Sequence, residues 1–172
     1  MSKTKNPMLQ IQIEKLTLNV GAGRDTRKLE KGEKLLKKIT GIEPVRTKTD
    51  KRIQGWGLRP GLPVGCKITL RGEKAKEVLK NILHAMDHEL KESSFDEYGN
   101  ISFGITEYVD IKNVKYDTEI GMMGLQASIT LERPGYRVSK RKTKKSKLPR
   151  NHRINKNEAV KFMEDNYDVQ VK

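Results

Sequence analysis

The sequence predicts an α+β fold in which two main helices pack on one face of a mostly antiparallel sheet. In several short segments apolar and polar residues alternate, which is the period of half-buried strands. In two longer segments the apolar residues recur every three or four positions, the spacing of helices that bury one face. The order is strand, helix, strand, strand, helix and then further strands, which is typical of a ferredoxin-like two-layer sandwich.

Periodicity places the first elements. A strand is expected over residues 9–20, where apolar and polar side chains alternate. A helix should follow, capped by Asp25 or Thr26 and stopped by Gly41, because glycine readily takes the left-handed conformation that ends helices. A second strand is expected over residues 45–49.

Strand and helix periods continue in the rest of the chain. Alternation over residues 64–71 predicts another strand, and three-and-four spacing from Glu73 to Leu90 predicts the longest apolar helix face. After a turn, residues 101–105 and 125–132 alternate again. The two helices are therefore expected to cover one face of a sheet built from these strands.

Composition changes along the chain predict its organisation. Residues 1–8 are expected to form a flexible N-terminal arm, and residues 9–133 an α+β domain that carries a long loop over residues 50–63. Residues 134–172 should form a basic extension that ends in a short helix over residues 155–167.

Charge points to a polyanionic partner. The 172 residues include 36 Lys or Arg and 22 Asp or Glu, a formal net charge of +14, which favours nucleic acid as the partner. An anionic membrane is the rival, but no apolar run approaches the roughly 20 residues that span a bilayer, and no signal peptide opens the sequence. We therefore expect no membrane contact and a cytoplasmic protein. The one cysteine, Cys66, has no disulfide partner and is expected in the core.

The sheet face away from the helices is the first candidate binding surface. It should expose hydroxyls, amides and cations, which can meet phosphates and sugar hydroxyls. An ordinary solvated sheet face fits the pattern equally well, since antiparallel sheets often leave one side wet. The residues concerned are Thr17, Asn19, Lys67, Thr69, Arg71, Gln126, Ser128 and Thr130.

The loop over residues 50–63 is the second candidate. Trp56 lies between Gly55 and Gly57, and the nearby cations are Lys51, Arg52 and Arg59. An aromatic ring among cations suits base stacking combined with phosphate contact. The alternative is a hairpin whose tryptophan folds back onto the core.

The basic segment, residues 133–153, is the third candidate, because such a run self-repels when free and would become ordered along a phosphate backbone. A solvated tail or a localisation signal is the alternative. Its ten cations are Arg133, Arg137, Lys140, Arg141, Lys142, Lys144, Lys145, Lys147, Arg150 and Arg153.

The sequence carries no recognisable motif of catalysis. Thr26 stands where a dinucleotide-binding loop begun at Gly21 and Gly23 would need its third glycine, and no phosphate-binding GxxxxGK[ST] motif occurs. His84 and His88 would share a helix face, but no further ligands accompany them, so no metal site is expected. We therefore expect no cofactor and no enzymatic activity.

Five segments resemble the L-five family of ribosomal proteins that bind 5S rRNA in the large subunit, in its archaeal and eukaryotic form. These segments follow the family's order and span most of the chain, and the extension after Pro134 resembles that of the same branch. They are IEKLTLNVGAG (residues 13–23), ITGIEPVRTKTDKRI (39–53), GLRPGLPVGCKITLRG (57–72), FDEYGNISFGITEY (95–108) and IGMMGLQASITLERPGYRV (120–138).

The resemblance implies a structural constituent of the large subunit that helps to anchor 5S rRNA in the central protuberance, beside 23S-type rRNA and neighbouring large-subunit proteins. It implies that the loop over residues 50–63 contacts peptidyl-site tRNA through the cations, glycines and Trp56 named above. It also implies that the basic segment contacts other rRNA. The residues that it makes candidates for 5S rRNA contact are Thr17, Asn19, Arg46, Lys48, Lys67, Thr69 and Arg71.

Two other functions remain as alternatives. A free-standing RNA chaperone or a non-specific single-strand RNA-binding protein would tolerate many RNA sequences. An RNA-modifying enzyme would need a placed acid, base or nucleophile, which the motifs do not provide.

Overall fold

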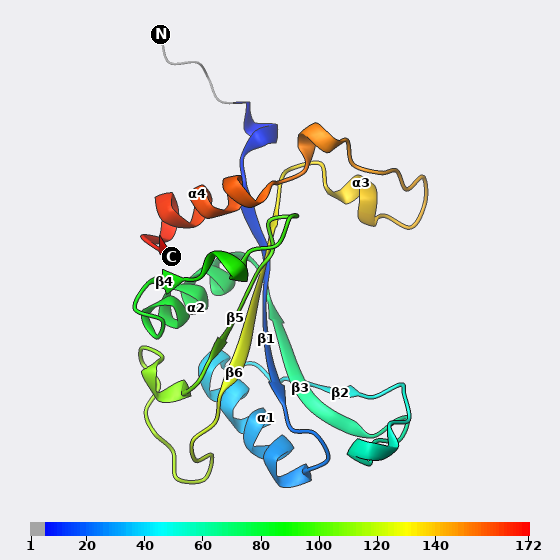
Figure 1. Cartoon of the computed structure of the whole chain (residues 1–172), viewed down its shortest axis with the longest axis vertical. Helices are drawn as coiled ribbons and strands as arrows, with labels where there is room; N and C mark the ends of the chain where they lie inside the picture. The colour runs from blue at the N-terminus through cyan, green and yellow to red at the C-terminus, as the bar shows by residue number, and fades with distance from the viewer. Residues whose placement is uncertain (1–5) are drawn as a thin grey trace.

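The computed structural model describes residues 6–172 and confirms the predicted α+β fold (Figure 1). Its centre is a five-stranded antiparallel sheet in the order β2-β3-β1-β6-β5. Because β3 lies between β1 and β2, the connection through α1 is a split β-α-β unit of the ferredoxin-like type. The strands are β1 (Gln12–Gly21), β2 (Val45–Lys48), β3 (Pro63–Leu70), β5 (Ile101–Ile105) and β6 (Leu125–Glu132).

Helices α1 (Thr26–Thr40) and α2 (Gly72–His84) pack on β1 and β3. Asp25 caps α1 by accepting hydrogen bonds from two backbone N–H groups, and Gly41 ends it at a φ of 69°. Gly32 allows the close approach of α1 to the sheet, since a Cβ there would lie 3.0 Å from Val20 Cγ1 and 3.1 Å from Cys66 Sγ. The core is the layer between these helices and the sheet.

The C-terminal part of the chain shares this core. Helix α4 (Lys156–Tyr167) begins with a capping box, in which the Asn155 side chain accepts from the backbone of Glu158 and the Glu158 side chain accepts from the backbone of Asn155. Ile154 and Met163 are fully buried with the apolar residues of the sheet. The extension is therefore docked on the sheet layer.

The remaining elements are short. Strands β4 (Glu89–Leu90) and β7 (Gln170–Val171) form a parallel pair, and α3 (Arg137–Lys140) lies within the basic segment. Single 3₁₀ turns are η1 (Pro7–Leu9), η2 (Gln54–Trp56), η3 (Glu92–Ser94), η4 (Tyr108–Asp110) and η5 (Arg150–His152).

Two predicted boundaries are wrong. The strand expected from residue 9 begins at Gln12, because Pro7–Leu9 forms a 3₁₀ turn and leaves Leu9 exposed. The helix expected to reach Leu90 ends at His84, and Leu90 enters the core from β4 instead. Of the expected N-terminal arm, residues 1–5 lie outside the described residues.

Candidate nucleic-acid interface

The sheet face that is not covered by α1 and α2, here called the open face, carries polar side chains in register across neighbouring strands. In one row, Ser102 of β5, Ser128 of β6, Thr17 of β1 and Thr69 of β3 lie opposite one another. The hydroxyl oxygens of Ser102 and Ser128 are 3.1 Å apart, within hydrogen-bond distance. The strands thus bring together hydroxyls that are widely separated in sequence.

A second row lies beside the first. Gln126, Asn19 and Lys67 are paired across β6, β1 and β3, and the Asn19 amide donates to Gln126 Oε1 over 3.3 Å. Lys15, opposite Thr130, adds a cation to the same face. Lys15 was not among the predicted contacts, although it has the same place in the alternation as Thr17 and Asn19; a β-bulge between Ile13 and Lys15 shifts the register only on its N-terminal side.

The open face carries little negative charge. Neither row contains a carboxylate, and Lys67, Thr69 and Arg71 are exposed. Glu132 continues the same side of β6, but the ammonium group of Lys140 lies 3.0 Å from its carboxylate and 2.6 Å from that of Glu14. The surface can therefore accept a polyanion without repulsion from its own acids.

Strand β2 is oriented differently from what was expected. Arg46 lies opposite the buried Cys66 and forms an ion pair with Glu33 of α1, so it is directed to the helix side of the sheet. Burial raises the pKa of the neighbouring Cys66 thiol to about 11. The strand presents Val45, which is 65% exposed, in the row of Lys67. We therefore remove Arg46 from the candidate contacts of the open face.

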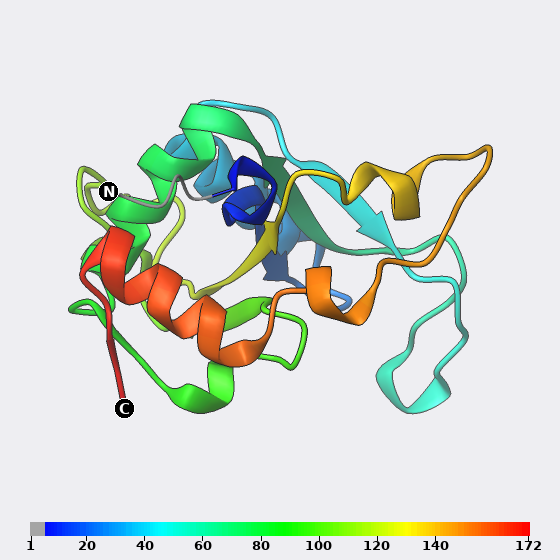
Figure 2. The same ribbon diagram turned by 90° about the horizontal axis from the view of Figure 1, so that it is seen from above.

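The loop over residues 50–63 is a hairpin that joins β2 to β3 and stands away from the sheet (Figure 2). Trp56 is 71% exposed, so it is not a core residue. The chain turns at Gly57, whose φ is 64° and whose missing Cβ leaves room for Arg24, since a Cβ would lie 2.6 Å from Arg24 Nη1. Arg24 adds a cation that no local sequence pattern indicated, and Lys48, Lys51, Arg52 and Arg59 are exposed.

The basic segment extends from the same side of the molecule as the hairpin, as both views show (Figures 1 and 2). Its base is fixed by Lys140, which bridges Glu14 and Glu132, and its tip by the Arg141 guanidinium, which donates to the carbonyl of Lys144 over 2.8 Å. Most of its other cations are exposed, and Arg153 is half-buried; the exposed ones are Arg137, Lys142, Lys144, Lys145, Lys147 and Arg150.

Arg133 is the exception among the ten cations of this segment. Only 6% of it is exposed, its Nη2 lies 2.7 Å from Glu158 Oε1, and its Nη1 donates to the carbonyls of His152 and Arg153. Burial acts to raise the pKa of Glu158, but the backbone N–H of Asn155 and the Arg133 guanidinium outweigh it, so this pKa is lowered. Arg133 therefore holds the extension to the sheet and is withdrawn as a candidate rRNA contact.

His84 and His88, which were expected on one helix face, do not share a helix. Only His84 is helical, while His88 has a φ of 57° and its Nδ1 lies 3.2 Å from the carbonyl oxygen of Tyr167. Within residues 6–172, no three His, Cys, Asp or Glu side chains are grouped as metal ligands. No helix in this range is long and apolar enough to cross a bilayer.

Known proteins are similar to this sequence over almost its whole length. The family model described as "Ribosomal protein L5" matches residues 6–59, and the model of the C-terminal part of the same family matches residues 63–162. The large ribosomal subunit protein uL5 of Nanoarchaeum equitans is 50% identical over 168 residues, which cover 97% of this chain and 99% of that protein. The protein of the same name from Sulfurisphaera tokodaii is 46% identical over 171 residues, which cover 99% and 97% respectively. The chain therefore belongs to the ribosomal protein L5 family, a family of structural, non-enzymatic components of the large ribosomal subunit.

Proposed function

We propose that the chain binds 5S rRNA through the open face and helps to anchor it in the central protuberance of the large subunit. One observation carries this proposal: four strands present hydroxyls, amides and cations in register, with no carboxylate in either row. Hydroxyls and amides suit sugar and base edges, and cations suit phosphates. The open face therefore offers partners for each part of an RNA chain.

The hairpin over residues 50–63 and the basic segment, here called the two projections, would bind other RNA partners. The exposed Trp56 and its surrounding cations suit contact with peptidyl-site tRNA, by stacking and by charge. The exposed cations of the basic segment suit the backbone of 23S-type rRNA. Neighbouring large-subunit proteins of the central protuberance would complete the environment.

The double variant Lys67→Ala/Arg71→Ala tests the open face. Both side chains are exposed, and Arg71 makes no side-chain cap for α2, so the fold should be unchanged. We expect 5S rRNA binding to weaken roughly tenfold, and the slope of log affinity against log salt to fall by about two units, one for each lost phosphate contact. Filter binding across a salt series measures both.

The matched control is Lys74→Ala/Lys80→Ala, which removes the same charge from exposed positions on α2. If it weakened binding as much as the open-face variant, net charge alone would explain the loss and the assignment would fail. Unrelated hairpins that bind as tightly as 5S rRNA would instead support a non-specific RNA-binding protein.

A further inference from the structure

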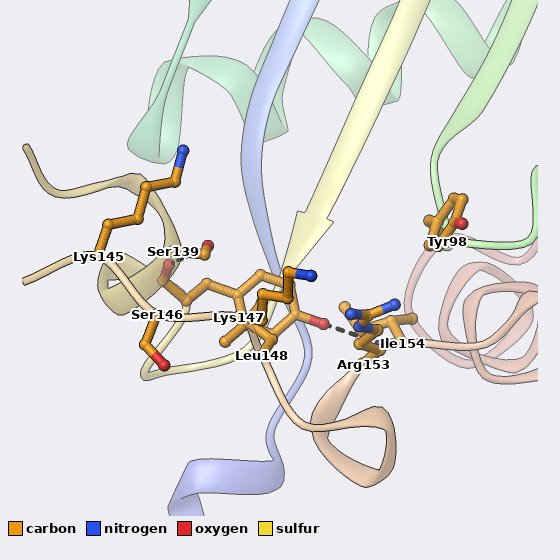
Figure 3. Close-up of a pocket in the computed structure, with 9 residues that line it drawn as sticks. Tyr98, Ser139, Lys145, Ser146, Lys147, Leu148, Arg153 and Ile154 are labelled. Carbon is orange, nitrogen blue, oxygen red and sulfur yellow. Dashed lines mark hydrogen bonds between the residues drawn. The ribbon is translucent and has the colours of Figure 1, made fainter.

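A pocket of about 550 Å³ lies beside the basic segment, apart from the two rows of the open face and from the hairpin. Three separate stretches of chain form its walls: the turn at Tyr98, the turn of α3 at Tyr136 and Ser139, and residues 145–154 (Figure 3). Its volume falls in the range of about 300–1,000 Å³ that is typical of pockets for small ligands. The pocket is thus large enough for one nucleotide and too small for a duplex.

Hydrogen bonds hold two of the walls in place. The Tyr136 hydroxyl donates to the carbonyl of His152 over 3.2 Å and accepts from the backbone N–H of Ile154 over 2.9 Å, which fixes the phenol ring. The Ser139 hydroxyl donates to the carbonyl of Tyr136, and the N–H of Ser146 donates to the carbonyl of Val138. The pocket is therefore formed before any ligand arrives.

The third wall is the turn that carries Tyr98. Asp96 Oδ1 accepts from the backbone N–H groups of Tyr98 and Asn100, at 2.9 and 2.7 Å. Gly99, at a φ of 77°, packs directly on Ile154, where a Cβ would lie 2.6 Å from Ile154 Cγ2. The turn thus packs on Ile154, which lines the pocket, while the Tyr98 side chain is 62% exposed.

The lining combines apolar and cationic side chains. Leu148, Ile154 and the ring of Tyr136 are its apolar members, and in Figure 3 the charged ends of Lys147 and Arg153 lie between Leu148 and Tyr98. None of the residues lining the pocket is acidic, and within residues 6–172 neither Lys147 nor Arg153 forms an ion pair. The pocket suits a ligand that is flat and apolar on one side and anionic on the other.

We propose that this pocket holds one unpaired nucleotide of a bound RNA, with its base against Tyr98 and its phosphate beside Lys147 and Arg153. The proposal rests on the RNA binding of the proposed function. Unpaired bases in loops and bulges are the usual targets of aromatic side chains, because bases in a duplex are already stacked. RNA is favoured over an acidic protein segment because the cations continue outside the pocket at Lys142 and Lys144, where the adjoining phosphates of an RNA chain would run.

The test uses five RNA hairpins: one fully paired, and four that carry a single bulged A, C, G or U. The intact chain should bind at least one bulged hairpin about tenfold more tightly than the paired hairpin, as expected for one base stacked on an aromatic ring. Tyr98→Ala should abolish this preference without changing affinity for the paired hairpin, and Tyr98→Phe should retain it. Fluorescence anisotropy measures the affinities, and thermal melting checks that the variants remain folded.

Tyr116→Ala is the matched control, since Tyr116 is also an exposed tyrosine but does not line the pocket. A bulge preference that is absent from the intact chain, or that Tyr116→Ala reduces as much as Tyr98→Ala, would overturn the proposal. The proposal would also be wrong if free AMP, or a Glu-rich peptide with one Trp, bound the intact chain as tightly as the bulged hairpin does and lost this affinity in Tyr98→Ala. Binding of 5S rRNA, measured in parallel, separates the outcomes: if it persists without a bulge preference, only the pocket assignment fails.

Discussion

Arg133 shows how one cation of a basic segment can stabilise the fold while its neighbours remain available to solvent. Its guanidinium donates to two backbone carbonyls and pairs with Glu158, which ties the end of β6 to the start of α4. Its Nε makes no hydrogen bond within the described residues. The buried charge is thus largely, although not completely, satisfied, and removing it would leave several partners unpaired.

Arg133→Ala should therefore lower the free energy of unfolding by about 2–4 kcal/mol, because it leaves two carbonyls and a partly buried carboxylate without their donor. Chemical denaturation measures this change. Lys145→Ala removes the same charge from an exposed position and should stay within about 0.5 kcal/mol of the unchanged chain.

The acid side of the stability curve provides a second measurement on the same variant. The folded pKa of Glu158 is lowered from 4.5, so the stability that this group contributes is present above that value and is lost as the pH falls through the folded pKa. Arg133→Ala should reduce this acid-dependent loss. If Arg133→Ala kept the stability of the unchanged chain but bound rRNA more weakly, Arg133 would be an RNA contact and not a structural residue.

At the level of elements, the hairpin over residues 50–63 should act as an outward probe. Trp56→Ala should change the free energy of unfolding by no more than about 0.5 kcal/mol, since the side chain is largely exposed. Affinity for 5S rRNA should stay the same, while peptidyl-site tRNA should bind about fivefold more weakly to large subunits that carry the variant.

Trp56→Phe is the control for that variant, because it keeps an aromatic ring for stacking and should retain most of the tRNA affinity. A large fall in melting temperature for Trp56→Ala would contradict the exposed position. Unchanged tRNA affinity would contradict the tRNA contact.

The elements also show how far sequence periodicity can predict this fold. Alternation located β3, β5 and β6 to within one or two residues, because each strand buries alternate side chains in the core. Leu90 kept the helical spacing of α2 but lies in β4, since Asp87 and His88 take positive φ values of 51° and 57° and reverse the chain. Periodicity indicates which residues are buried, but it does not show that the backbone between them stays helical.

The candidate site was predictable in part for a similar reason. Thr17, Lys67 and Thr69 follow from alternation, because their neighbours are clearly apolar. In β2 only Val45 is apolar, so the strand has no alternation that could tell which side Arg46 faces. Its pairing with Cys66 shows that side. Sequence patterns could not identify Tyr98 as part of a pocket, since the other residues that line the pocket are more than 35 positions away in the chain.

At the scale of the whole molecule, the open face, the hairpin and the basic segment are cationic surfaces of one fold with a shared core. The hairpin and the basic segment extend from the same side (Figures 1 and 2), while α4 and the buried Ile154 hold the extension to the shared core. With a net charge of +14, the free chain carries substantial self-repulsion that a polyanion would relieve. Binding of RNA should therefore stabilise the whole fold.

This stabilisation should appear as a rise in melting temperature that depends on salt. At a 5S rRNA concentration of about 100 times Kd, linkage gives roughly 2.7 kcal/mol, which for a chain of this size corresponds to about 5–10 °C. The rise should shrink as salt is added, because binding releases counterions from the RNA. Differential scanning fluorimetry at several salt concentrations measures it, and Lys67→Ala/Arg71→Ala provides the comparison, with a smaller rise and a weaker salt dependence. A rise that is equal for 5S rRNA and for heparin at every salt concentration would mean that the chain responds to polyanions in general, and the assignment of the open face to one RNA would then be wrong.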